Sequence, residues 1–209
     1  MQDKIIKHTK PAIDKIRKFR EYLVTFENKF ESDIKELSDD FRNEYGSDLY
    51  MLALELDSDE YWNIEMYFKD IFRYSLILSI NSFFEDLMNS LCKEIKLLKE
   101  VELKLDDLRG HGINRAKLYL VKVCGLEFPT DSHEWKEIKK LNDIRNFIAH
   151  TNGDISKAKD PKKIKYIISN TRDLSGHHRI KIEKEYLETI LINIESFIGL
   201  LTDKSGRSN

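Results

Sequence analysis

Apolar residues recur at intervals of three and four along most of this chain, and that spacing is typical of amphipathic helices. The first run predicts a long helix over residues 3–44, in which Pro11 marks the true start as the first helical position. After a short acidic connection, capping residues from Asp57 to Glu60 predict a second long helix that runs to about Lys99. The middle of this helix, from Ile71 to Leu91, is apolar on nearly all sides and is expected at the buried centre of the fold.

Shorter helices are predicted in the second half of the chain. A tight turn at residues 109–112 leads into a short helix that ends near Val123. A capping box, formed by Asp131 and the glutamate three residues later, begins a further helix that ends at residues 151–153. A last amphipathic helix covers residues 187–201.

The segment between these last two helices has a different pattern. The Lys-rich stretch 157–165 is expected to be a loop. Residues 164–169 and 179–182 are expected to form two short strands around a Ser-Gly turn. The predicted fold class is therefore all-α, a helical bundle with long helices and a small β-hairpin before the last helix.

Composition agrees with a mostly helical fold. Of the 209 residues, 34% are charged, whereas only 8 are Gly and 3 are Pro, so residues that interrupt helices are scarce. A hydrophobic share of 41% is enough to form a core and argues against disorder. We expect a single domain, with residues 1–50 as an N-terminal helical extension, 57–202 as the core and 203–209 as a frayed tail.

The sequence predicts neither a membrane span nor a secretory signal. The longest apolar stretch, around residues 74–84, is about half the 18 or so residues that a transmembrane helix needs. The N-terminus carries charges but no apolar region of the signal-peptide kind, so the expected compartment is the cytoplasm. Cys92 and Cys124 lie in apolar helical patterns without a CxxC motif or a Cys/His cluster, and we expect buried thiols.

The net charge is only −2, but the charges are unevenly distributed. Residues 31–70 contain 3 basic and 13 acidic residues, whereas residues 131–182 contain 12 basic and 7 acidic residues. The basic excess has two interpretations, an ordinary solvated surface or a patch that attracts phosphate groups. The position of the basic residues must decide between them.

Candidate chemistry lies in the stretch DIRNFIAH, which ends at His150. Asn146 and His150 are four residues apart, so they share one stripe of the helix with Lys139 and can leave the core together. Arg145 lies nearer the apolar edge, where its long side chain can run along the helix. A polar stripe of this kind is also what any solvated helix face shows, and this alternative stays open.

An arginine, an asparagine and a histidine without a carboxylate pair suit phosphodiester chemistry better than acyl transfer. Metal-free RNA cleavage needs a deprotonated 2′-hydroxyl, a protonated leaving 5′-oxygen and neutralisation of the charge on the phosphoryl group. Histidine can perform either proton transfer, and the arginine fork can hold the phosphate. One chain supplies one such histidine, so two-fold packing of two copies would complete an acid and base pair. Neither a metal site nor a cofactor is predicted.

These residues resemble the HEPN superfamily over residues 60–201. Its members are compact α-helical domains with an R-x(4–6)-H motif, often with a polar residue after the arginine, as in RNFIAH here. The preceding helix SLILSINSFFEDLMNSL, Trp135 upstream of the motif and a glycine shortly after the histidine also match. The resemblance implies a metal-independent endoribonuclease of the toxin or phage-defence kind, working as a homodimer with the two motifs facing each other.

By this resemblance, Arg145 and His150 are catalytic, and Asn146 is an orienting polar group. Glu85 resembles a polar residue on the neighbouring helix of many members, and it either supports catalysis or simply orients Arg145. The RNA would be single-stranded or in loops. The residues expected to contact it are Lys136, Lys139, Lys140, Asn152 and Lys157.

A second class of function stays open, in which the chain is a non-catalytic helical interaction module. Its partner would be an antitoxin, a nucleotidyltransferase or a larger defence complex, docked on the acidic segment 31–70 or on the motif helix. Some HEPN-like proteins are binding modules of this kind, often with a degraded motif, whereas the motif here is intact. The alternative predicts that His150→Ala leaves function unchanged.

Overall fold

The computed structural model of the protein describes residues 2–204. Its helices, helical turns and strands are, in chain order, α1 (Gln2–Tyr45), α2 (Tyr50–Asp57), α3 (Asp59–Trp62), η1 (Asn63–Phe68), α4 (Lys69–Leu98), η2 (Leu105–Asp107), α5 (Gly112–Leu118), η3 (Tyr119–Val123), α6 (His133–Thr151), η4 (Ile155–Lys157), α7 (Pro161–Ser169), β1 (Leu174–Ser175), β2 (Lys181–Ile182) and α8 (Lys184–Lys204). The fold is all-α with one small hairpin before the last helix, which confirms the predicted fold class.

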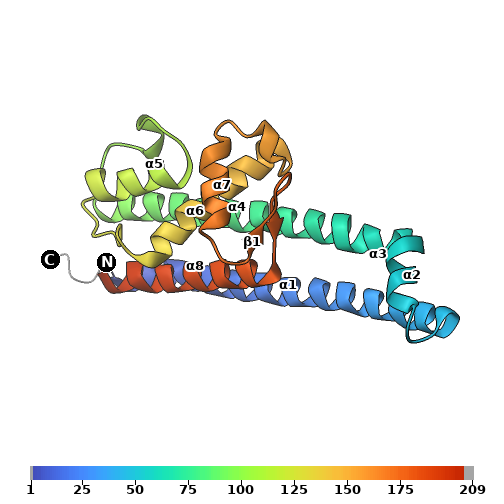
Figure 1. The fold of residues 1–209 in the computed structure, drawn as a ribbon. Helices are drawn as coiled ribbons and strands as arrows, with labels where there is room; N and C mark the ends of the chain where they lie inside the picture. Colours follow the sequence, from blue (N-terminus) through green and yellow to red (C-terminus); the bar gives the residue numbers. More distant parts are fainter. Residues whose placement is uncertain (1, 205–209) are drawn as a thin grey trace.

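The two longest helices, α1 and α4, run antiparallel and set the shape of the molecule (Figure 1). α1 packs along α8 and α4, and α8 runs back towards the start of α1 (Figure 1). α1 and α4 extend past the other helices, and α2 and α3 connect them at that far end (Figure 1). α5 and α6 pack on the half of α4 away from this connection. The molecule is thus a helical body with a projecting two-helix arm.

The core forms where α4, α6 and α8 meet. Ile77, Ile80 and Met88 of α4 are fully buried. Phe197 of α8 stacks on Trp135 of α6, with 5.4 Å between the ring centroids. The middle of the second long helix is therefore central to the core, as predicted, but Ile71, the first residue of the predicted stretch, is exposed.

α1 starts earlier than the sequence predicts. Pro11 was expected at the first helical position, but the helix runs from Gln2 and Pro11 lies inside it. The reason is packing, because Ile5, Ala12 and Ile16 are all buried in the same core as α4 and α8. Their burial offsets the backbone hydrogen bond that the proline cannot donate. α1, predicted as an extension, therefore contributes to the core.

The predicted acidic connection contains a helix, α2, that the sequence interpretation missed. Ala53 and Leu54 of α2 are buried, and their burial stabilises the helix. Ser58 caps the next helix as expected, since its side chain accepts a hydrogen bond from the Tyr61 backbone N–H at 3.1 Å. The second long helix is therefore present, with the π turn η1 near its start.

Residues 157–169 were expected as a loop and a strand, and this prediction is wrong. Lys157 is the last residue of η4, and residues 161–169 form the helix α7. Asp160 caps α7 by accepting a hydrogen bond from the Lys163 N–H at 2.9 Å, and isoleucines of α7 three and four residues apart are buried. The hairpin lies before α8 as expected. Its first strand, however, is Leu174–Ser175 rather than 164–169.

Buried polar contacts hold the hairpin on the long helices. Arg73 of α4 donates to both carboxylate oxygens of Glu27 in α1, at 2.8 and 2.9 Å, and to the Ile182 carbonyl at 2.9 Å. The Tyr74 hydroxyl donates to the Ile180 carbonyl. Because the hairpin backbone also pairs with the loop that follows α6, these contacts help to fix the end of the motif helix.

Cys92 and Cys124 are buried and unpaired, as the sequence predicts. Burial raises the pKa of both thiols, that of Cys92 to about 12. They are therefore protonated at neutral pH, which excludes them as ready nucleophiles.

Within residues 2–204, no helix combines the length and the apolar character that crossing a bilayer requires. At the C-terminus, residues 203 and 204 of the predicted frayed tail are the last residues of α8. The remainder of that tail lies outside the described residues.

Candidate functional site

Helix α6 carries the Arg-Asn-x3-His motif and is fixed at both ends. Ser132 caps its start by accepting a hydrogen bond from the Trp135 N–H at 3.2 Å, so the cap is Ser132 rather than the predicted Asp131. Asn152 ends the helix where predicted, in a left-handed conformation with φ of 51°. The apolar side of α6 packs into the core, which leaves the polar residues of the motif on its outer side.

Arg145 and Asn146 contact each other directly. The Arg145 Nη1 donates to the Asn146 Oδ1 at 2.9 Å, which orients the amide. The Arg145 Nε is buried and has no hydrogen-bond partner among the described residues.

His150 lies exposed in the last turn of α6. Together with Asn146 it lines a cleft of about 810 Å³ between α6 and the segment that follows it. Arg145 does not line this cleft, and reaches it only through its hydrogen bond to Asn146. The structure thus brings two of the three predicted catalytic residues onto one concave surface and places the third beside it.

Three lysines line the same cleft, namely Lys157, Lys159 and Lys163. Lys163 pairs with Asp143 at 2.7 Å, and Lys157 pairs with Asp154 at 3.3 Å. Lys159 has no ion-pair partner in the part of the chain that the structure describes. Asp143 and Asp160 line the cleft as well, whereas Asp154, the partner of Lys157, lies outside the lining. Of these three lysines, Lys157 is one of the predicted RNA contacts.

The other predicted lysine contacts lie outside this cleft. Lys136 and Lys139 are exposed on α6, before the motif. Lys139 lies near Lys117, and its positive charge adds to burial in lowering the pKa of Lys117. Lys140 pairs with Glu137 at 2.8 Å and lines a separate cleft between α6 and α8.

Asn152, also predicted as an RNA contact, has a structural position. Besides ending α6, it accepts a hydrogen bond through its backbone carbonyl from the Arg179 Nη2 at 2.9 Å. This contact ties the end of the motif helix to the hairpin region. Its side chain is exposed and does not line the cleft of His150.

Glu85 lies on α4 beside the start of α5. Its carboxylate oxygens are 3.7 Å from the position that a Cβ on Gly112 would take. Among the described residues, Glu85 forms no ion pair with Arg145, whose hydrogen bond goes to Asn146. The orienting contact that the sequence interpretation considered for Glu85 is therefore made by Asn146.

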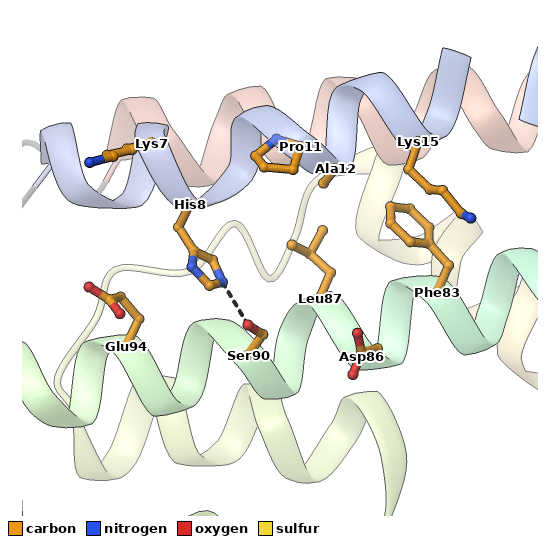
Figure 2. Close-up of a pocket in the computed structure, with 10 residues that line it drawn as sticks. All are labelled: Lys7, His8, Pro11, Ala12, Lys15, Phe83, Asp86, Leu87, Ser90 and Glu94. Carbon is orange, nitrogen blue, oxygen red and sulfur yellow. Dashed lines mark hydrogen bonds between the residues drawn. The ribbon is translucent and has the colours of Figure 1, made fainter. Parts of the chain in front are cut away.

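The sequence interpretation missed a second groove, of about 740 Å³, between the first turns of α1 and the second half of α4. Figure 2 shows His8 facing Ser90 there, with 2.9 Å between the His8 Nε2 and the Ser90 oxygen. Asp86 and Glu94 line the same groove, but among the described residues no carboxylate bonds to the His8 ring, so the acid of a catalytic triad is not in place. The pair comes from two helices distant in sequence, so no motif could reveal it.

Comparisons with known proteins leave the site to be judged on its own geometry. Neither a protein-family model, nor a curated protein, nor a solved structure matches the chain significantly. Within residues 2–204, no group of three or more His, Cys, Asp or Glu side chains is arranged to hold a metal ion.

Proposed function

We propose that the chain is a metal-independent endoribonuclease of the HEPN type, acting on single-stranded or loop RNA. The observation that carries this proposal is the cleft in which His150 and Asn146 lie with three lysines. The lysines would attract the RNA backbone, and the His150 imidazole can donate or accept a proton. As a cellular role, the resemblance to the HEPN family favours a toxin or phage-defence effector in the cytoplasm.

The proposed reaction is an internal transfer of the phosphoryl group. The RNA 2′-oxygen loses its proton and attacks the adjacent phosphorus, while the bond to the 5′-oxygen breaks and that oxygen is protonated. The products are a 2′,3′-cyclic phosphate and a 5′-hydroxyl. His150 would perform one of the two proton transfers. Arg145 uses one N–H for Asn146, and its remaining outer donors would neutralise the charge that develops on the phosphoryl oxygens.

The proposal includes a homodimer, because one chain contributes one His150. α7 and the residues before it cover part of the motif side of α6, but His150 in the last turn is exposed. A two-fold axis beside this helix would place two copies of His150 in one composite site, one as the base and the other as the acid.

The test is cleavage of mixed cellular RNA by purified protein in excess EDTA, with the fragment ends mapped. The variants are His150→Ala and, as a matched control, His133→Ala, which removes an exposed histidine at the other end of the same helix. We expect wild type and His133→Ala to leave 2′,3′-cyclic phosphate or 3′-phosphate ends. His150→Ala should be slower by at least about 100-fold, the usual contribution of a general acid or base.

Equal cleavage by His150→Ala and wild type would refute the assignment of His150. Absence of cleavage by a folded, dimeric wild type would refute the nuclease and favour the interaction module. Loss of cleavage when EDTA is added would refute the metal-independent mechanism.

A further inference from the structure

The far end of the two-helix arm is a surface of its own. It consists of residues 44–71, which we call the tip, and contains the end of α1, α2, α3, η1 and the first turn of α4. In Figure 1 the tip lies at the opposite end of the molecule from the start of α1, away from α5 and α6. The tip is thus distant from the cleft of His150.

An apolar stripe faces solvent on this tip. Leu49, Leu52 and Leu56 are three and four residues apart, so they share one face of α2. All three are exposed, Leu52 at 57% and Leu56 at 73% of their surface. The folding of α2 does not use them, because Ala53 and Leu54 provide its buried contacts. Exposed apolar stripes of this kind mark interaction surfaces.

The neighbouring turn adds larger apolar side chains. Trp62, Met66 and Phe68 of α3 and η1 are exposed. The Trp62 Nε1 donates to the Glu55 carbonyl at 2.6 Å, which fixes α3 against α2 and brings the indole to the leucine-bearing helix. A surface that is already ordered loses little conformational entropy when a partner binds.

The charge of the tip selects the chemistry of its partner. Residues 44–70 contain eight acidic residues and a single basic one, Lys69, which pairs with Glu65. The negative charge of the tip affects Tyr45. Its pKa is raised by the Glu44 carboxylate first, and then by burial and by Asp57. Two tips, or a tip and an anionic membrane, would repel each other. A cationic partner with an apolar face is complementary in both respects.

We propose that the tip is the docking surface for a lysine- and arginine-rich amphipathic helix of another protein. The leucine stripe and the aromatic residues would receive the apolar face of that helix, and the surrounding carboxylates would pair with its basic residues. This binding function does not depend on the proposed nuclease, because the two surfaces lie on different parts of the molecule.

The chain contains its own reporter for the experiment. Trp62 is 41% exposed in the tip, whereas Trp135 is fully buried in the body. A blue shift of tryptophan emission on titration with a peptide therefore reports on the tip. The probe is a synthetic 18-residue Leu/Lys peptide with its leucines on one helical face. The control peptides are a scrambled sequence of the same composition and a Leu/Glu peptide with the same leucine positions.

We expect a saturable blue shift with the amphipathic Leu/Lys peptide, and little or none with the two controls. Leu52→Gln/Leu56→Gln should weaken binding by about tenfold or more, since two apolar contacts are lost. The matched control is Leu97→Gln, which changes an equally exposed leucine, at 72%, near the other end of α4 and should change binding less than about twofold. Asp48→Asn/Glu55→Gln should weaken binding of the cationic peptide and reduce its salt dependence.

Equal binding of the scrambled peptide, or an equal effect of Leu97→Gln, would overturn the proposal. So would self-association of the wild type, measured by sedimentation equilibrium, that Leu52→Gln/Leu56→Gln abolishes, because the occupant would then be a second copy. All substituted residues are exposed, and circular dichroism of each variant should match that of the wild type.

Discussion

The phenol of Tyr74 connects α4 to the hairpin region, next to the contacts of Arg73. Tyr74 is buried, its hydroxyl donates to the Ile180 carbonyl, and Gly153, at the end of the motif helix, lies against the ring. A side chain on Gly153 would clash with this ring, and its φ of 78° also favours glycine. Burial raises the pKa of Tyr74 to about 12. The ionisation of one residue is therefore coupled to the stability of the region that carries the site.

We expect this coupling to lower the stability of the protein at alkaline pH. The phenol ionises near pH 10 in the unfolded chain and near pH 12 in the folded protein, so its contribution is fully present below pH 10 and is lost as the pH rises to 12. The loss should be roughly 2–3 kcal/mol. Urea denaturation between pH 8 and pH 12 measures it. Tyr74→Phe should be less stable than wild type at pH 8 and have a flatter pH profile, and parallel profiles would contradict the coupling.

At this scale the helical period predicts part of the site. It places Asn146 and His150 on one face, because residues four apart lie on the same side of a helix. It does not predict that Arg145 donates to Asn146 while its Nε is buried, since those contacts depend on how α6 packs on its neighbours. His8 and Ser90 could not be paired from the sequence for the same reason, because α1 and α4 must first be in place.

Among the helices and strands, α7 shows where the sequence interpretation failed. The cap Asp160, the proline after it and isoleucines at helical spacing were all present. The β-branched residues favoured a strand, and the lysines before them favoured a loop. The segment is helical because the helix buries Ile164 and Ile167 against the rest of the protein. Lys163 lies on α7 and Lys159 lies just before it, so the positions of two of the three lysines in the cleft of His150 depend on this helix.

Pro11 offers a test at the scale of one helix. It lies inside α1, where it removes one backbone hydrogen bond and its ring meets the carbonyl four residues earlier. Pro11→Ala should therefore stabilise the protein, by about 1–3 kcal/mol. Thermal unfolding of wild type and variant measures the change. Unchanged or lower stability would mean that the turns before Pro11 contribute little to the folded state.

On the scale of the whole molecule, the acidic tip and the three lysines of the cleft lie on different parts of the structure. Three lysines in the cleft limit the number of phosphates that the site can neutralise. For single-stranded RNA, the logarithm of the affinity should fall with the logarithm of salt concentration with a slope of about −2. Fluorescence anisotropy of a labelled single strand, with His150→Ala to prevent cleavage, measures this slope.

A triple variant tests the origin of that slope. Replacing Lys157, Lys159 and Lys163 with glutamine should reduce both the affinity and the magnitude of the slope. The same replacement of Lys7, Lys10 and Lys18, exposed on α1, serves as the control and should leave both unchanged. A similar loss in the two triple variants would show that RNA binds by overall charge rather than in the cleft.

The long arm also decides how the size of the protein must be measured. α1 has 44 residues and is about 66 Å long at 1.5 Å per residue. A compact chain of this size has a radius of gyration of about 17 Å, which is that of a sphere only about 44 Å across. An elongated particle has a larger friction coefficient than a sphere of the same mass. A monomer will therefore elute early from a gel-filtration column, at the volume of a larger globular protein. The stoichiometry of any composite site has to come from static light scattering, which reports mass without regard to shape.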